Sequence, residues 1–85
     1  MVSYRVEVVR QAVKDYEIIP PHERQTLKEA ILSLEKNPRN SRVKKLNGRD
    51  YYRLRVGDWR VIFAISDKWK AVTIVTIERR TSTTY

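Results

Sequence analysis

Arginine side chains recur at short intervals in residues 51–63, and their spacing is that of a β-hairpin. Apolar and polar residues alternate on both sides of Gly57-Asp58, which predicts two strands joined by a two-residue turn. This register places Arg55 directly opposite Arg60, with Arg53 diagonal to the pair. Like charges in that arrangement destabilise a sheet. We therefore expect a phosphate-binding face, because the planar guanidinium group binds phosphate oxygens in pairs.

A third strand extends this face toward the end of the chain. If residues 67–70 form a four-residue loop, the register carried through the loop places Arg60 opposite Ile77. Because side chains alternate along a strand, Arg79 then lies on the same face as Arg60, and Arg80 points to the other face. A one-residue bulge in this strand would exchange Arg79 and Arg80.

The elements that position these arginines follow from hydrophobic periodicity. Residues 2–9 alternate as a strand, and apolar residues recur at helical spacing in 11–18 and 21–36, with a Pro-Pro break between the two helices. A polar, basic connection follows over residues 39–50. The remaining strands are predicted at 51–56, 59–66 and 71–79. The order βααβββ predicts a single α+β domain over residues 1–85, an antiparallel sheet with a two-helix hairpin packed on one face.

The composition limits the partners of this domain. The chain has 85 residues, a net charge of +8 and an isoelectric point near 10.1, which favours an anionic partner. It has no cysteine and one histidine, so we expect no metal and no cofactor. No apolar run approaches the roughly 18 residues of a membrane span, and no signal peptide precedes the first strand. These features predict a soluble cytoplasmic protein without a membrane partner.

Five short motifs, in this order and at these spacings, resemble the RelE/ParE superfamily of toxins from toxin–antitoxin systems. They are Ile19-Pro-Pro21, Leu34 with Asn37-Pro38, Lys45-Leu-Asn-Gly48, the segment from Tyr52 to Ile62, and Ile77-Glu-Arg-Arg80 with Tyr85. The resemblance covers essentially the whole chain. It implies a RelE-like fold and an acidic antitoxin as partner.

The resemblance also implies an activity. RelE-like toxins are ribosome-dependent endoribonucleases that cleave mRNA, whereas ParE-like toxins inhibit DNA gyrase. Matching positions suggest these catalytic residues: Arg53, Arg55, Arg60, Arg79 and Tyr85. Arg80 competes with Arg79, because some relatives have a shorter spacing between arginine and tyrosine. The best-known RelE proteins have lysines in place of Arg53 and Arg55, and many continue beyond the tyrosine into a last helix.

Other residues have a functional and a structural interpretation. Lys44 and Lys45 either contact the RNA backbone or only keep a loop soluble. Tyr51 either stacks on a base or packs across the strands. Glu78 is expected to form a salt bridge to an arginine rather than to act as a general base. Trp69, in a turn between lysines, is a candidate for stacking or partner contact.

Two further assignments concern the apolar side and the choice of branch. We expect Trp59 in the core and His22 on the surface. Four converging arginines and two short helices favour an mRNA-cleaving toxin of the RelE type. A ParE-like gyrase inhibitor and a non-catalytic basic module that binds RNA or antitoxin are the alternatives.

Overall fold

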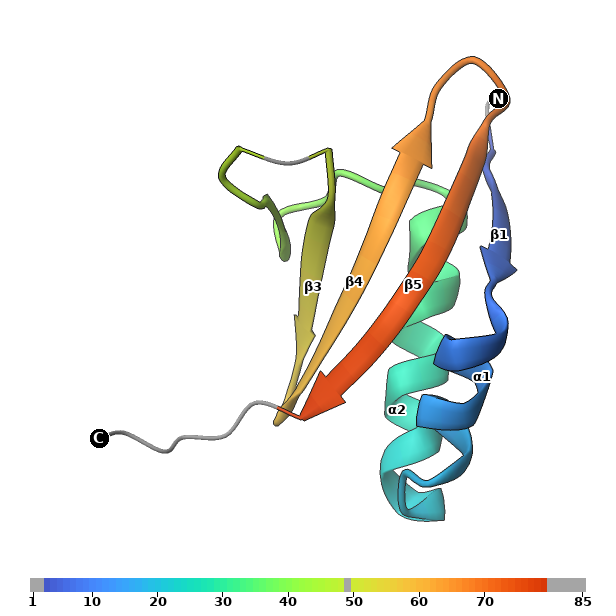
Figure 1. Ribbon diagram of the computed structural model, residues 1–85, viewed down its shortest axis with the longest axis vertical. Coiled ribbons are helices and arrows are strands. Elements are labelled where there is room, and N and C mark those ends of the chain that lie inside the picture. The colour runs from blue at the N-terminus through green and yellow to red at the C-terminus, as the bar shows by residue number, and fades with distance from the viewer. Residues whose placement is uncertain (1–2, 49, 80–85) are drawn as a thin grey trace.

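The computed structural model describes residues 3–48 and 50–79. Its helices are α1 (Arg10–Glu17), α2 (Pro21–Leu32) and the short 3₁₀ helix η1 (Ser33–Glu35). Its strands are β1 (Arg5–Val8), β2 (Val43–Lys45), β3 (Tyr52–Val56), β4 (Trp59–Ser66) and β5 (Ala71–Arg79). Both α-helices pack against one face of a twisted sheet (Figure 1). This arrangement confirms the predicted α+β fold class.

The sheet is mixed rather than wholly antiparallel. In the described residues it has five strands in the order β1-β5-β4-β3-β2, and β1 pairs with β5 in parallel. The prediction of an antiparallel sheet was wrong for β1, because alternation along a strand carries no information on its direction. Hairpin connections join β2, β3, β4 and β5 in turn, whereas the helices follow β1 in the chain and β1 lies parallel to β5 at the other edge of the sheet.

The residues predicted as a basic connection contain a further strand. Val43–Lys45 pairs antiparallel with β3, placing Lys44 opposite Arg53 and Lys45 opposite Tyr52. A segment of three residues that includes two lysines is too short and too polar to show the alternation of a strand. This short, charged strand forms the edge of the sheet. Lysines are common on edge strands, where their charge discourages pairing of the exposed backbone N–H and C=O groups with another chain.

The second helix has the predicted apolar stripe and a tighter end than predicted. Leu27, Ala30, Ile31 and Leu34 are all buried at the spacing of one helix face. The α-helix begins at Pro21, where a missing N–H costs nothing. It ends at Leu32 and continues as the 3₁₀ turn η1, so Leu34 still faces the core.

A single core fills the space between these helices and the sheet. Its buried residues are Ala12, Ile19, Leu27, Ala30, Ile31, Leu34, Leu54, Val56, Trp59, Val61, Phe63, Val72, Ile74 and Ile77. The alternate residues of β3 and β4 therefore point into the core, and the residues between them point to the opposite face. That opposite face is the one that carries the arginines.

Asp15 of α1 replaces a missing strand neighbour. β1 pairs with β5 only as far as Ile74, and beyond it the Asp15 carboxylate accepts the backbone N–H of Ile77 at 3.0 Å and the hydroxyl of Thr76 at 2.9 Å. Desolvation opposes ionisation of this carboxyl, but the hydrogen bonds from Ile77, Gln11 and Thr76 hold its pKa below its ordinary value. Asp15 thus joins α1 to the last strand.

We expect Asp15→Asn to lower the free energy of unfolding by about 1–3 kcal/mol at pH 7, because it weakens acceptors for a half-buried N–H and a hydroxyl. The folded-state pKa is lowered, so this stabilisation is complete above the unfolded pKa of about 4 and is lost as pH falls through the folded value. Urea unfolding between pH 2 and 7 measures both effects. Asp50→Asn, at an exposed position, is the control, and an equal loss in that variant would contradict the anchoring role.

Candidate functional site

Three arginines lie on the sheet face opposite the helices, as the hairpin register predicts. Arg55 of β3 is directly opposite Arg60 of β4, and Arg53 is opposite Ile62, diagonal to Arg60. Gly57 has a φ of 58°, the left-handed conformation that a tight hairpin turn requires. We call Arg53, Arg55 and Arg60 the arginine face.

The arginine face opens into two adjoining hollows. One, of 340 Å³, lies over the centre of the sheet and is lined by Leu46, Tyr51, Arg60, Ile62, Val75, Thr76 and Glu78. The other, of 480 Å³, lies beside the β2 edge and is lined by Ser41, Arg42, Lys44, Arg53, Arg55 and Gly57. We call the first the Arg60 groove and the second the edge hollow. The arginines are therefore divided between two neighbouring surfaces and do not meet at one point.

Arg60 has an unusual environment within its groove. Its Nε lies 3.6 Å from Oε1 of Glu78, which is an ion-pair distance but too long for a hydrogen bond. Among the described residues, this Nε is the one buried side-chain nitrogen or oxygen without a hydrogen-bond partner. Buried polar groups are rarely left in this state, because an unmade hydrogen bond costs free energy. An acceptor oxygen that enters the groove would supply the missing hydrogen-bond partner of Arg60 Nε.

Glu78 lies opposite Arg60 on β5 and forms the salt bridge that the sequence predicts. Its side chain is about half exposed, so solvent screens the interaction. The pair gives the groove a carboxylate as well as a guanidinium. It also reduces the repulsion between Arg60 and Arg55 that the hairpin register creates.

The predicted position of Arg79 was wrong. The β4–β5 register shifts at Ile62 and Phe63, so Val75 has no partner and Arg60 faces Glu78 rather than Ile77. Arg79 is consequently opposite Trp59, and its guanidinium lies 5.7 Å from the centre of the Trp59 ring.

This contact places Arg79 over a core residue, on the side of the sheet away from the arginine face. The competing candidate Arg80 and the terminal Tyr85 both lie outside the described residues.

The lysine pair is separated by strand alternation. Lys44 lines the edge hollow together with Arg53, whereas Lys45 is opposite Tyr52, whose ring stacks on Phe63 of the core. Of the two predicted RNA-binding lysines, the structure thus brings Lys44 to the arginine face and leaves Lys45 on the other side of the edge.

Tyr51 and Arg42 complete the surroundings of the arginine face. Tyr51 is 38% exposed and lines the Arg60 groove, as a stacking residue would require. Sequence reasoning missed Arg42, which lines the edge hollow. Its basic side chain lies directly before β2, so recognition of that strand would have placed it there.

Trp59 lies in the core and His22 at the surface, as predicted. Trp59 is 8% exposed and its Nε1–H donates to Oε1 of Glu23 at 2.8 Å, which ties β4 to α2. His22 lies at the surface of the first turn of α2, near Glu23. Neither contributes to the arginine face.

Residues 3–48 and 50–79 contain no group of three or more histidines or acidic residues arranged to hold a metal ion. None of the helices in this part of the chain is long and apolar enough to cross a membrane.

Comparison with known proteins identifies the family. The model of the ParE toxin of type II toxin–antitoxin systems matches residues 6–83. The chain is 32% identical over 82 residues to the putative toxin RelE1 of Methanocaldococcus jannaschii, covering 92% of this chain and 91% of that protein. It is 32% identical to a chain of the archaeal RelE–RelB complex from Pyrococcus horikoshii OT3, with a TM-score of 0.85 over 96% of this chain and 100% of that one.

The isolated E. coli RelE toxin has the same fold, with a TM-score of 0.83 and 17% identity over 95% of this chain and 88% of that one. Fold and sequence together define the class as the toxin of a type II toxin–antitoxin system. The chain belongs to the RelE/ParE superfamily, which confirms the resemblance found in its motifs.

Proposed function

We propose that this toxin is a ribosome-dependent endoribonuclease of the RelE type, which cleaves mRNA in the cytoplasm and so inhibits translation. The observation that carries the proposal is the buried Nε of Arg60, which has no hydrogen-bond partner and lies in a groove that Tyr51 also lines. A phosphate oxygen is the acceptor that suits this nitrogen, and a nucleobase suits the exposed phenol ring. The archaeal relative RelE1 and the RelE of P. horikoshii support the RelE branch.

The proposed reaction is attack of a ribose 2′-hydroxyl on the adjacent phosphorus, with departure of the 5′-oxygen. The negative charge that develops on the phosphorane oxygens is stabilised by the guanidinium of Arg60. Arg53 and Arg55 in the edge hollow hold neighbouring phosphates of the same strand. A guanidinium group stays protonated at neutral pH and is therefore a poor base, so positioning and electrostatics supply most of the rate.

Further residues have proposed roles. Lys44 contacts the RNA backbone from the edge hollow. Arg80 and Tyr85 remain candidates for a second phosphate contact and a stacking contact, and the cation–π position of Arg79 makes Arg80 the better of the two arginines to test. The ribosome presents the mRNA in the geometry that these residues require.

The proposed resting state is a complex with a small acidic antitoxin. Solved structures with this fold include toxin–antitoxin complexes of RelE with RelB from P. horikoshii and E. coli. A net charge of +8 and an open arginine face suit an acidic segment that folds as it binds.

Induction of the toxin without its antitoxin distinguishes the two branches. We expect pulse labelling to show that incorporation of amino acids stops first and that mRNA is cut on ribosomes, because the proposed target is translation. The family model is named for ParE toxins, so gyrase inhibition is the second candidate. Arrest of DNA synthesis while protein synthesis continues would establish that candidate and reject the nuclease.

A further inference from the structure

The turn between β4 and β5 presents an aromatic ring to solvent. It lies at the opposite end of β4 from the Gly57-Asp58 turn (Figure 1). Trp69 in this turn is 67% exposed, whereas the other tryptophan, Trp59, is 8% exposed. Burial of apolar surface stabilises the folded state by about 25 cal/mol per Å², and an indole ring that stays exposed does not contribute this stabilisation. Folding therefore does not explain the position of Trp69.

The backbone holds this ring in place. The N–H of Trp69 donates to Oγ of Ser66 at 3.3 Å, and the N–H of Arg5 donates to the carbonyl of Lys70 at 2.8 Å. Lys70 has a φ of 51°, a left-handed conformation that closes the turn, and its Nζ lies 5.4 Å from the centre of the Tyr4 ring. A ligand that stacks on Trp69 would meet a turn that is already ordered, which lowers the entropy cost of binding.

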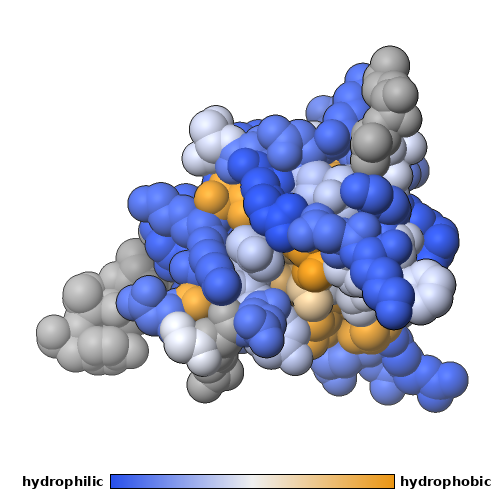
Figure 2. All heavy atoms as spheres, turned by 90° about the horizontal axis from the view of Figure 1, so that it is seen from above, coloured by the Kyte–Doolittle hydropathy of each residue, from blue (hydrophilic) through white to orange (hydrophobic). Residues whose placement is uncertain are grey.

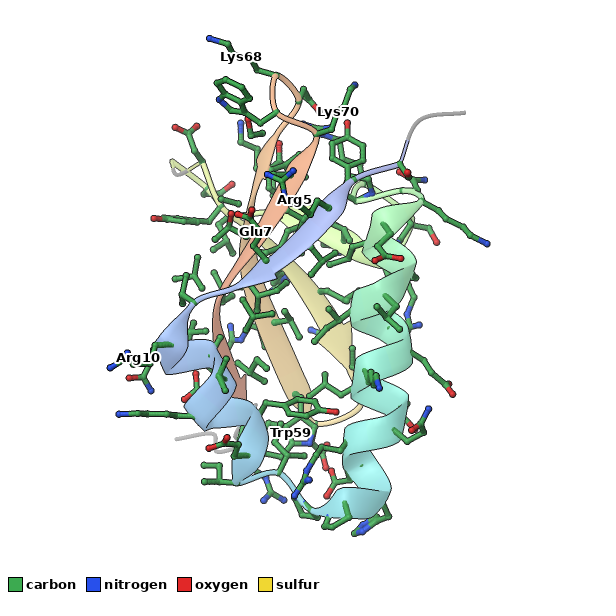
Figure 3. All side chains as sticks on the ribbon, turned by 90° about the vertical axis from the view of Figure 1, so that its right-hand side faces the viewer. Arg5, Glu7, Arg10, Trp59, Lys68 and Lys70 are labelled. Carbon is green, nitrogen blue, oxygen red and sulfur yellow. The ribbon has the colours of Figure 1, made fainter. Side chains whose placement is uncertain are left out.

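The charge around the ring is positive. Lys68 Nζ lies 5.3 Å from the centre of the Trp69 ring, and Figure 3 shows Lys68 at the tip of the turn with Lys70 below it. Arg5, further down, is paired with Glu7 at 2.9 Å. The turn also contains Asp67, whose carboxylate accepts both terminal nitrogens of Arg39 at 3.0 Å. Arg39 therefore balances the only carboxylate among residues 67–70, and the lysines are left in excess.

The hydroxyl of Tyr4 also donates to Asp67, at 2.7 Å. These bonds from Arg39 and Tyr4 lower the pKa of Asp67 to about 2, so the carboxylate stays ionised and hydrogen-bonded.

Seen from the end of the molecule that carries this turn, the surface is largely covered by hydrophilic side chains (Figure 2).

We propose that the turn of Lys68, Trp69 and Lys70 is a binding site for single-stranded RNA, separate from the arginine face. A base stacks on the open side of Trp69, and the two lysines contact the flanking phosphates. Aromatic stacking together with a basic surface is how proteins bind single strands without reading their sequence.

An acidic peptide and an anionic membrane are the other anionic partners to consider, and neither would contact both the ring and the lysines of this turn as RNA does. An acidic peptide would use the lysines but not the ring. An anionic membrane would require more apolar side chains beside Trp69 than one indole flanked by Asp67 and two lysines.

The distance along β4 separates this turn from the arginine face. Arg60 and Ser66 are six residues apart in a continuous strand, which at about 3.3 Å per residue is roughly 20 Å. A single nucleotide cannot contact both Arg60 and Trp69. The turn is therefore an additional contact with RNA, and it does not depend on whether the arginine face is catalytic.

The test uses the purified full-length chain and a labelled single-stranded oligonucleotide of seven 2′-O-methyl nucleotides. This probe cannot be cleaved by 2′-hydroxyl attack, so its binding is measured apart from any nuclease activity. We expect Trp69→Ala to weaken binding by about tenfold to a hundredfold, as for the loss of one stacked base, and Trp69→Phe to retain most of it. Fluorescence anisotropy at several salt concentrations gives the affinities.

Charge variants separate RNA binding from other uses of the turn. Affinity falls as salt rises, and the double variant Lys68→Ala with Lys70→Ala should make this decline shallower. The slope of log affinity against log salt should become less negative by about 0.7 per lysine. The charge-matched control, Lys14→Ala with Lys28→Ala on the exposed side of the helices, should leave Trp69-dependent binding unchanged.

The proposal is overturned if Trp69→Ala binds the oligonucleotide with wild-type affinity, or if the control and turn variants lose equal affinity for it. It is also overturned if the turn variants bind the antitoxin more weakly but the oligonucleotide as well as wild type does, because the turn would then be a protein contact. Combining Trp69→Ala with Arg53→Ala and Arg55→Ala tests independence. Additive losses support two sites, and no further loss in the combined variant argues against a separate site.

Discussion

Arg60→Ala is expected to reduce ribosome-dependent mRNA cleavage by about 10²–10³-fold, the effect of removing one preorganised donor from a site of developing charge. The loss should occur without unfolding. Arg60 is half-buried, stands opposite Arg55 and forms only a 3.6 Å ion pair with Glu78, so its removal relieves one repulsion and loses one weak attraction. We expect the free energy of unfolding to change by no more than about 0.5 kcal/mol.

The measurement is single-turnover cleavage on programmed ribosomes, with urea unfolding of the same preparations. Arg60→Lys retains the charge but loses the planar fork, so it should recover only part of the rate. Arg10→Ala, on an exposed arginine of α1, should cleave at the wild-type rate. A stability loss in Arg60→Ala as large as that of a core substitution would show that Arg60 is structural and would remove it from the site.

Glu78→Gln separates the two interpretations of the carboxylate in the same assay. If Glu78 only pairs with Arg60, the glutamine variant should retain most of the activity, because the amide keeps an oxygen near Nε. If Glu78 accepts the 2′-hydroxyl proton, the rate should fall by about 10²–10⁴-fold.

The hairpin that carries the arginines was predictable because local sequence determines it. Gly57 permits the left-handed turn, and the turn fixes every pair from Val56 with Trp59 to Tyr52 with Phe63. Alternation then assigns the arginines to one face and the apolar residues to the core. The turn, the register and the face all agree, so this part of the structure required no information from distant residues.

The position of Arg79 was not predictable from the same pattern. Residues 71–77 are apolar or threonine at every position, so their sequence fits either face and does not show that Val75 is unpaired. The bulge places Glu78 beside Arg60 and Arg79 over Trp59. A single extra residue therefore changes the chemistry of the groove, and only the strand pairing reveals it.

The edge hollow was also beyond sequence reasoning. It lies beside β2, which is three residues long and contains two lysines, and is lined by Arg53 of the neighbouring strand β3. The side chains of Ser41 and Arg42 reach this surface because β2 pairs with β3, an interaction between segments that are separated in the chain. Local periodicity carries no signal for such a pairing.

Association with the antitoxin is expected to depend steeply on salt, because the two hollows of the arginine face are lined by four basic residues beside Glu78 and Arg60 and attract an acidic segment from a distance. Electrostatic steering of this kind raises association rates by about 10–10³-fold at low ionic strength. Stopped-flow measurements of the purified pair from roughly 50 to 500 mM salt should show that decline. The dissociation rate should change less, because the apolar part of the contact is not screened.

The matched variants test where the steering originates. Arg53→Ala with Arg55→Ala and Lys14→Ala with Lys28→Ala remove the same charge, the first pair from the arginine face and the second from the helices on the other side of the sheet. If the antitoxin docks on the arginine face, the first pair should flatten the salt dependence and slow association at low salt by about tenfold, whereas the second should alter both only slightly. Equal effects would mean that the net charge of +8 attracts the antitoxin without directing it. The arginine face would then be left with RNA as its only proposed ligand.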